Sequence, residues 1–348
     1  MGEEAVGSIV VYGHGFPREI VWLAGYEAVD ETRPDAPVAL RDGSRISALL
    51  EPFLDPYVRS FLLRLEQGAF DRNPAVIFLR ESPGALHAYQ YALEFRRLGL
   101  LPEDGPALFI FNLLMSPDEE VSVFNAAELA RLESFLREIQ PRRAGSVRET
   151  LERVSLRASL LGQIAQAQSG GRLSGAAAFN TRNAAMHMPL ARSIEVLNQL
   201  RGRDLRKPPA PDHRFALLGS PLAGGGLHRV VEEFGTLALD LQSGLPAPTP
   251  PKDLQQAVLQ FSEASLSPRQ ARPNAFIEAL EPLLAKHRIE TVLWQVDPTD
   301  DLWGWLMPNM RDLCDRMQIG FIDLGFVPAW PDEVCLGKAR RRLRGAMS

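Results

Sequence analysis

The sequence predicts an α/β protein with two parallel-sheet domains of the Rossmann or flavodoxin type, which flank a helical middle segment. In both outer parts of the chain, short apolar runs that end in polar or glycine-rich loops alternate with amphipathic helical patterns. The stretch between them is helical throughout, and 348 residues are too many for one ordinary compact domain. We expect α/β domains at 1–124 and 209–348, with the helical segment at 125–208.

The first domain is predicted from apolar runs that each lead into a helical pattern. Its expected elements are a strand, glycine turn and helix over 8–25, a helix over 45–70 broken near Asp55-Pro56, a strand over 74–82, a helix, and a strand over 106–115. The first helix starts near Pro17, because the N–H that proline lacks would be unsatisfied in a first helical turn anyway. Two strands separated by a helix predict a right-handed βαβ unit in a parallel sheet.

Alanine, leucine, glutamate and arginine at helical spacing fill the middle segment, and the proline-rich stretch 206–213 is the predicted domain boundary. Strands and helices then alternate again. The expected elements are a strand, glycine-rich turn and helix over 214–235, a strand over 236–242, helices up to about 288, strands over 290–296 and 319–326, and a helix over 303–317 between them. The basic run from Lys338 to Arg344 is predicted to be the positive end of a terminal helix.

Charge and cysteine content exclude several classes of protein. With a net charge of -5 and a pI near 5.8, the chain has no excess of basic charge for phosphates, so nucleic acid is not expected as its main partner. No apolar stretch approaches the roughly 20 residues that cross a bilayer, and the acidic N-terminus is unlike a signal peptide, so no membrane partner is expected. Only Cys314 and Cys335 are present, without a disulfide framework, which predicts a cytoplasmic location.

The sequence GSPLAGGG is a candidate substrate-binding loop. It follows a predicted strand and precedes a predicted helix, so its backbone amides could receive an anion, or the segment could be a plain tight turn. It is neither GxGxxG nor a P-loop, and the pattern leaves both interpretations open. The candidate substrate-binding residues are Gly219, Ser220, Gly224, Gly225 and His228 from this region, together with Trp303.

A second polar loop follows the strand over 290–296. Its acids, Asp297, Asp300 and Asp301, could bind a hard cation, take part in acid–base chemistry or cap the next helix, and capping by Asp300 or Asp301 is the simplest interpretation. Trp303 and Trp305 cannot share one helical face at this spacing, so at least one is expected to project away from the core.

None of the six histidines has metal-ligand spacing. His14 lies in the turn after the first strand and His228 lies at the start of the helix after the glycine loop. Either is a candidate proton donor, although an isolated histidine is more often structural. From the residues alone, the sequence predicts a two-domain α/β protein with no identified chemistry.

Several stretches, in one order along nearly the whole chain, are similar to the landmarks of one family. LDPYVRSFL resembles its CPYVRS helix start, VIFLRESPGALHAY its strand ending in CDSMRR, FALLGSPLAGGGLHRVVEEFG its GSPL segment, and RIETVLWQVDPTDDLWGWLM its passage around KFCDP. The chain in this way resembles the D-component proteins of 2-hydroxyacyl-CoA dehydratases and the related benzoyl-CoA reductase subunits.

In that family three cysteines ligate a [4Fe-4S] cluster whose open iron site meets the acyl-CoA thioester. The resemblance places these cysteines at Asp55, at or next to Ser82, and at Val296, and none of these residues is a cysteine. Valine cannot ligate iron, and oxygen ligands are a poor substitute for thiolates. The resemblance therefore implies no cofactor and no metal in this chain, with a cluster only in a partner subunit.

Three functions follow as expectations. The resemblance implies a cluster-free subunit that pairs with a cluster-bearing homologous subunit and contributes to binding an acyl-CoA thioester. A second possibility is a stand-alone acyl-thioester lyase or other enzyme, with Asp297, Asp55, Ser82 and His14 as acid, base and polar contacts. A third is a non-catalytic structural or regulatory module, in which side chains such as Val296 and Trp294 fill the former site. Loss of the ligands leaves open whether the chain is itself an enzyme.

Overall fold

A computed structural model describes residues 7–139, 146–201, 213–242, 251–262 and 274–347. The chain divides into two compact units. The first unit contains Met1–Leu156, Met186–Ser193 and Thr249–Ala264, and the second contains Arg157–Ala185, Ile194–Pro248 and Ser265–Ser348. The proline-rich stretch 206–213 predicted as a boundary lies, except for His213, outside the described residues.

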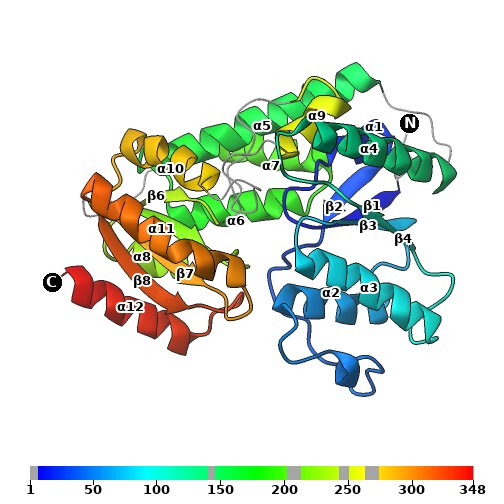
Figure 1. Cartoon of the computed structure of the whole chain (residues 1–348), viewed down its shortest axis with the longest axis horizontal. Coiled ribbons are helices and arrows are strands. Elements are labelled where there is room, and N and C mark those ends of the chain that lie inside the picture. The colour runs from blue at the N-terminus through cyan, green and yellow to red at the C-terminus, as the bar shows by residue number, and fades with distance from the viewer. Residues whose placement is uncertain (1–6, 140–145, 202–212, 243–250, 263–273, 348) are drawn as a thin grey trace. The chain divides into compact units, whose positions relative to one another are not determined.

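A four-stranded, all-parallel sheet forms the centre of the first unit, in the order β2-β1-β3-β4 (Figure 1). The strands are β1 (Ser8–Tyr12), β2 (Glu27–Asp30), β3 (Ala75–Leu79) and β4 (Ala107–Phe111). Three of them are predicted from their apolar sequences. The sequence does not predict β2, because its four residues, EAVD, contain only two apolar side chains between two acids and form a short edge strand.

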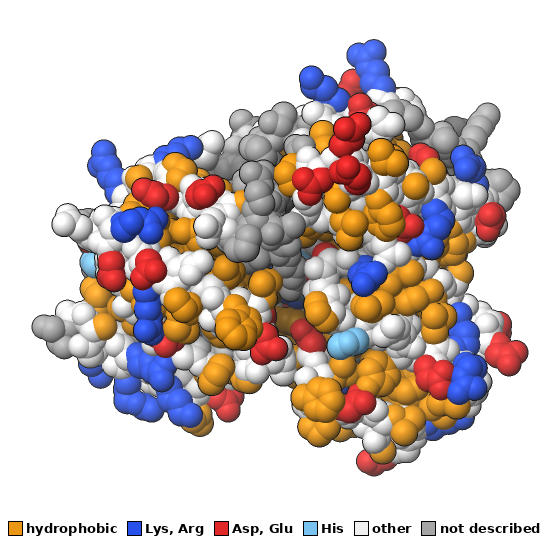
Figure 2. Space-filling view, viewed as in Figure 1, with side chains coloured by type: hydrophobic (Ala, Val, Ile, Leu, Met, Phe, Trp, Pro, Cys, Tyr) orange, Lys and Arg blue, Asp and Glu red, His pale blue; other side chains and the backbone are white. Residues whose placement is uncertain are grey.

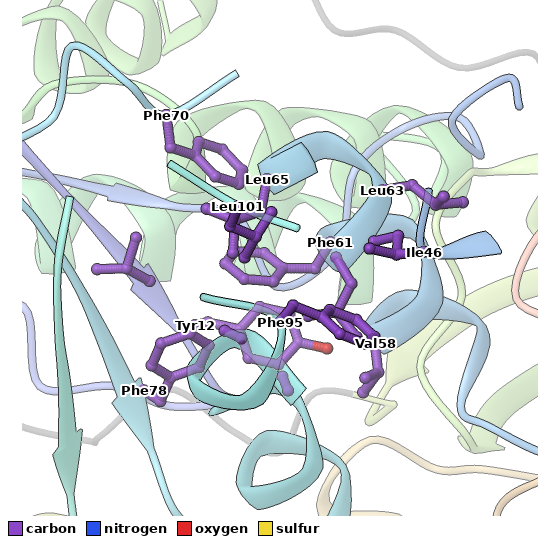
Figure 3. Close-up of a cluster of buried hydrophobic side chains, with 14 of the residues drawn as sticks. Tyr12, Ile46, Val58, Phe61, Leu63, Leu65, Phe70, Phe78, Phe95 and Leu101 are labelled. Carbon is purple, nitrogen blue, oxygen red and sulfur yellow. The ribbon is translucent and has the colours of Figure 1, made fainter. Parts of the chain in front are cut away.

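Helices cover both faces of this sheet. They are α1 (Glu19–Leu23), the short 3-10 helix η1 (Ser47–Leu49), α2 (Pro56–Glu66), α3 (Pro83–Arg97), α4 (Glu119–Ile139) and α9 (Leu254–Ser262). Alternate residues of the central strands, such as Tyr12 and Phe78, pack with α2 and α3 in one buried cluster (Figure 3). On the other face Phe109 stacks on Phe135 of α4, with ring centroids 4.5 Å apart.

The second unit repeats the same strand order with β6-β5-β7-β8, again all parallel. Its strands are β5 (Arg214–Gly219), β6 (Thr236–Asp240), β7 (Thr291–Val296) and β8 (Gly320–Phe326). One face packs with α8 (Gly226–Val231) and α12 (Glu333–Met347), and the other with α10 (Ala275–Lys286) and α11 (Asp301–Met317). The prediction of an α/β protein with two parallel sheets is confirmed, as is the terminal helix.

Helices also fill the described part of the predicted middle segment. After α4 come α5 (Val147–Ser169), α6 (Gly175–Met186) and α7 (Leu190–Arg201). Leu160 and Ile164 of α5, Ala178 and Ala185 of α6, and Leu197 of α7 form a small buried cluster of their own.

Each sheet has one pair of neighbouring strands from which the chain continues toward opposite edges of the sheet. From β1 the chain continues to β2 on one side, whereas β3 leads to β4 on the other, and β5 and β7 repeat this pattern in the second unit. The loops that leave such a strand pair diverge, and α/β proteins bind ligands at this place, outside the carboxyl ends of the strands. The loops after β1, β3, β5 and β7 contain most of the residues singled out from the sequence.

Replacing Phe61 by alanine should strongly destabilise the first unit. Phe61 is 1% exposed, and its ring lies 4.6 Å from that of Tyr12, 5.1 Å from that of Phe70 and 5.5 Å from that of Phe78 (Figure 3). A cavity here should lower the free energy of unfolding by about 3–5 kcal/mol in urea denaturation. Phe53→Ala is the control, because Phe53 is 75% exposed and its loss should change stability by about 0.5 kcal/mol or less. Equal effects of the two variants would contradict this packing.

Candidate functional site

The loops after β1 and β3 are joined at the carboxyl edge of the first sheet. The backbone N–H of His14 donates to Oε1 of Glu81 at 3.2 Å, and the Ser82 hydroxyl donates to the same oxygen at 2.9 Å. Thr32, which follows β2, accepts a hydrogen bond from the N–H of Gly13 at 2.9 Å. Gly13 has φ of +131°, and an added Cβ would lie 2.7 Å from the backbone oxygen at the end of β3, so this turn requires glycine.

Asp55 and Ser82 each cap the N-terminus of a helix in this region. Oδ1 of Asp55 accepts from the N–H groups of Tyr57 and Val58 at 2.8 and 3.2 Å, at the start of α2. Oγ of Ser82 accepts from the N–H of the third residue of α3 at 3.3 Å. The two caps lie side by side: a Cβ built on Gly84 would be 3.7 Å from Oδ2 of Asp55 and 3.8 Å from Oγ of Ser82.

The first unit therefore brings three of the predicted catalytic residues, Asp55, Ser82 and His14, to one region, and two of them contact a fourth group that the sequence analysis missed. Glu81 is that group, and a signal for it existed, since it is an acid in the loop directly after a buried strand. The pKa of the Tyr12 hydroxyl is raised well above its ordinary value by burial and then by the charges of Asp55 and Glu81. The carboxyl edge of the first sheet therefore offers hydrogen-bond acceptors and titratable side chains.

In the second unit, Asp297 and Ser220 join the loops after β7 and β5. The Ser220 hydroxyl accepts from the N–H of Asp297 at 2.9 Å. Oδ1 of Asp297 accepts from the N–H and the hydroxyl of Thr299 at 2.9 and 2.7 Å, and Oδ2 accepts from the N–H of Ala329 at 3.0 Å. Asp297 is only 7% exposed. This predicted catalytic carboxylate therefore holds neighbouring loops together through its hydrogen bonds. The helix cap is Asp300, as the sequence predicts.

Several backbone N–H groups of the glycine-rich loop donate hydrogen bonds within the protein. The N–H of Ser220 donates to the backbone oxygen of Gln295 at 3.2 Å, that of Leu222 to Oε1 of Gln242 at 3.0 Å, and that of Ala223 to the backbone oxygen of Ala329 at 3.0 Å. Within the described residues, the N–H groups that remain for an anion lie in the last part of the loop. Gly224 lies there, and a Cβ built on it would meet no atom within 4 Å.

Close packing requires one other glycine of this loop and restricts the space at a second. Gly219 has φ of +130°, and a Cβ there would lie 1.7 Å from the backbone oxygen of Gln295, so no other residue fits against β7. A Cβ on Gly225 would lie 3.0 Å from Oδ1 of Asn180 in α6. These predicted substrate-binding glycines therefore have a structural reason in addition to any functional one.

His228, predicted as a substrate-binding residue, is completely buried and belongs to a charged cluster. Its Nε2 lies 3.0 Å from Oδ2 of Asp240, which also accepts from the Arg182 guanidinium at 2.8 Å. The ring of Phe179 lies 4.4 Å from the imidazole. Burial alone would raise the pKa of Asp240, but His228 and Arg182 outweigh it and hold this pKa far below its ordinary value. The sequence contains a signal for Asp240, because this acid lies within an otherwise apolar strand. It contains no such signal for Arg182.

The remaining two predicted positions lie in the core of the second unit. Trp303 is 2% exposed, with its ring 5.3 Å from that of Trp294 and 5.6 Å from that of Phe276, whereas Trp305 is 81% exposed. One tryptophan does project away from the core, as the spacing predicts. Val296 is the last residue of β7 and is 5% exposed within the same apolar cluster.

The residues at the family's ligand positions do not fit an iron–sulfur cluster. Asp55 and Ser82 present oxygens that cap helices, and Val296 has no donor atom. Burial, and then Asp315, raises the pKa of the Cys314 thiol to about 12, so it is not available as a thiolate, and Cys335 lies in α12. In the described ranges no group of three or more His, Cys, Asp or Glu side chains could hold a metal ion.

Comparison with known proteins does not assign a family to this chain. No family model matches the sequence, and no curated protein matches it. In the part of the chain that the structure describes, no helix has the length and apolar character that a membrane crossing requires. The function is therefore inferred from the site itself.

Replacing Asp297 by asparagine should destabilise the second unit. The variant's amide would have to present an N–H group to one of the donors that the carboxylate now accepts from, which leaves a buried donor unsatisfied. The free energy of unfolding should fall by about 1–3 kcal/mol in urea denaturation. Asp301→Asn, at an exposed position in the first turn of α11, is the control and should cost about 0.3–1 kcal/mol. A fully stable Asp297→Asn variant would show that the hydrogen bonds of the Asp297 carboxylate do not stabilise these loops.

Asp240 should make the stability of the protein sensitive to acid. Because the folded-state pKa of Asp240 is depressed, its contribution is fully present above the unfolded pKa, about 3.9, and is lost as the pH falls through the folded value. Asp240→Asn should cost about 3 kcal/mol at pH 7, since the Arg182 guanidinium and the buried His228 then lack the negative charge that they both contact. Urea denaturation between about pH 2 and 7 should show a smaller loss of stability with acid in the variant. Parallel pH profiles for the two proteins would exclude this role.

Proposed function

We propose that this chain is a cluster-free subunit of a heteromeric acyl-CoA enzyme of the 2-hydroxyacyl-CoA dehydratase or benzoyl-CoA reductase type. It pairs with a cluster-bearing homologous subunit and contributes to binding the acyl-CoA thioester. The observation that carries this proposal is the proximity of Asp55 and Ser82. The resemblance equates these two positions, far apart in the sequence, with ligands of one cluster, and ligands of one cluster must lie together. A Cβ on Gly84 would touch both side chains.

The present roles of these side chains support the loss of the cluster. Aspartate and serine are the residues that best cap a helix N-terminus, and here each accepts hydrogen bonds from the first turn of its own helix. Val296 contributes to the core of the second unit. All three positions contribute to the stability of the fold, which supports the proposal that this chain has no cluster.

The places available for a thioester are the carboxyl edges of the two sheets, at the strand pairs β1/β3 and β5/β7. The first edge, with Asp55, Glu81, Ser82 and the turn at His14, can accept hydrogen bonds from the amide and hydroxyl groups of a pantetheine arm. The second edge has an open position at Gly224. Ligand binding at such edges is a general property of parallel α/β sheets.

A non-catalytic structural or regulatory module is the second candidate. Trp294 and Val296, which would fill the former site in that case, are 0% and 5% exposed, and the Asp297 carboxylate is occupied by three donors. These facts also weigh against a stand-alone enzyme that uses Asp297 as its base. The two candidates differ in whether the complex binds an acyl-CoA.

The deciding experiment is an anaerobic purification from the native host, with iron and sulfide analysis and identification of the co-purifying proteins. We expect no iron in this chain and a cysteine-bearing homologue in the same complex. Calorimetric titration of that complex with acetyl-CoA, and with free acetate as the control, then tests thioester binding.

Each outcome has a definite meaning. Stoichiometric iron in the isolated chain would show that Asp55, Ser82 and Val296 are wrongly identified as lost ligand positions. A complex that contains the homologue but does not bind acetyl-CoA or longer acyl-CoA esters would favour the non-catalytic module. A chain that purifies without a homologue would overturn the proposed pairing.

A further inference from the structure

The outer face of α12 is both basic and apolar. Val334, Lys338 and Arg341 follow one another at intervals of four and three residues, so they share one helical face, opposite the buried Leu336, Ala339 and Leu343. Phe326 at the end of β8 is 73% exposed and Val334 is 66% exposed, and Sγ of Cys335 lies 3.9 Å from the Phe326 backbone oxygen. We call Phe326, Val334, Lys338 and Arg341 the α12 patch. Figure 2 shows Lys and Arg side chains gathered where Figure 1 places α12.

The fold does not account for this patch. Arg340 pairs with Glu233 at 2.6 Å and Arg342 donates to the backbone oxygen of Asp323, so these two cations stabilise their own unit. Among the described residues, Lys338 and Arg341 form no ion pair. Attraction to the helix macrodipole is confined to the last turn, whereas these two residues lie nearer the middle of the helix. Exposed apolar side chains next to unpaired cations indicate an interaction surface.

The start of α4 carries a matching surface of opposite charge. Glu119 and Glu120 lie one turn before Val123 and Phe124, which are 67% and 40% exposed. All four lie opposite the buried face of α4, which is formed by Asn125, Leu129, Leu132 and Leu136. The first-turn position suits the two acids, but it gives no reason for the exposed valine and phenylalanine. We call these four residues the α4 patch.

We propose that the α12 patch of one copy of the chain docks on the α4 patch of a second copy. Each patch has two charged and two large apolar side chains, with positive charge on α12 and negative charge on α4. Lys338 and Arg341 would then meet Glu119 and Glu120, while the apolar groups are removed from water together. This inference goes beyond the proposed function and does not rest on it.

A protein surface fits the α12 patch better than a polyanion does. The chain as a whole carries a net charge of -5, which opposes binding to nucleic acid or to an anionic membrane surface. A phosphate backbone would also leave Phe326 and Val334 without an apolar partner. The chain itself supplies a surface that satisfies both the charge and the apolar requirement.

The test is sedimentation velocity of the purified full-length chain over a range of salt concentrations. We expect self-association that weakens as salt rises toward 1 M, where the screening length falls to about 3 Å. A Lys338→Glu/Arg341→Glu variant and a Glu119→Lys/Glu120→Arg variant should each self-associate at least roughly tenfold more weakly, because each brings like charges together. Mixing the two variants should restore association, since every reversed patch then finds its complement.

Controls separate docking from damage to the fold. Arg72→Glu reverses an exposed arginine outside both patches and should leave association unchanged. Circular dichroism and thermal unfolding should be the same for all variants. A monomeric wild-type chain, or a variant mixture that fails to associate, would overturn the proposal. Binding of a DNA oligonucleotide or of anionic vesicles by the α12 patch, without self-association, would overturn it as well.

Discussion

The parallel pairing of two central strands in each sheet determines where most of the candidate functional groups lie. Tyr12 pairs with Phe78 at the ends of β1 and β3, and Gly219 pairs with Gln295 at the ends of β5 and β7. Because the two strands end together, the following loops begin side by side at one edge before their connections leave in opposite directions. The hydrogen bonds from His14 to Glu81 and from Asp297 to Ser220 are consequences of this register.

Polar groups placed at such an edge are only partly exposed, so each of them needs a partner. Asp297 satisfies its carboxylate with three donors from neighbouring loops. The Asp240 side chain is only 4% exposed, and its charge is compensated by Arg182 and His228 from two different helices. Gln242 extends this cluster to the N–H of Leu222 in the glycine-rich loop. Loop conformation and buried charge are in this way coupled in the second unit.

The sequence predicts those features that depend on local pattern. Apolar runs such as ALFIF and TVLWQV specify the strands, and polar residues directly after them specify the candidate loops. The edge strand β2 escapes prediction because its four residues carry little apolar signal and depend on pairing with β1. Partnerships across the fold, such as Asp240 with Arg182, cannot be read from spacing, since no local rule links β6 to α6. Trp303 was singled out as a ligand contact from its position after the loop, whereas burial against Phe276 and Trp294 depends on the tertiary packing.

Helix capping explains why an aspartate and a serine at these two positions stabilise the fold. The position before a helix directs its side chain toward unpaired backbone N–H groups, which stabilise any acceptor placed there. Asp55 and Ser82 occupy this position at two adjacent helices, and their oxygens are well suited to accept from those N–H groups. A residue with a side-chain oxygen at the N-cap position therefore stabilises the fold through its own helix. The geometry that brings Asp55 and Ser82 to one edge of the sheet is therefore the same geometry that gives each of them a helix to cap.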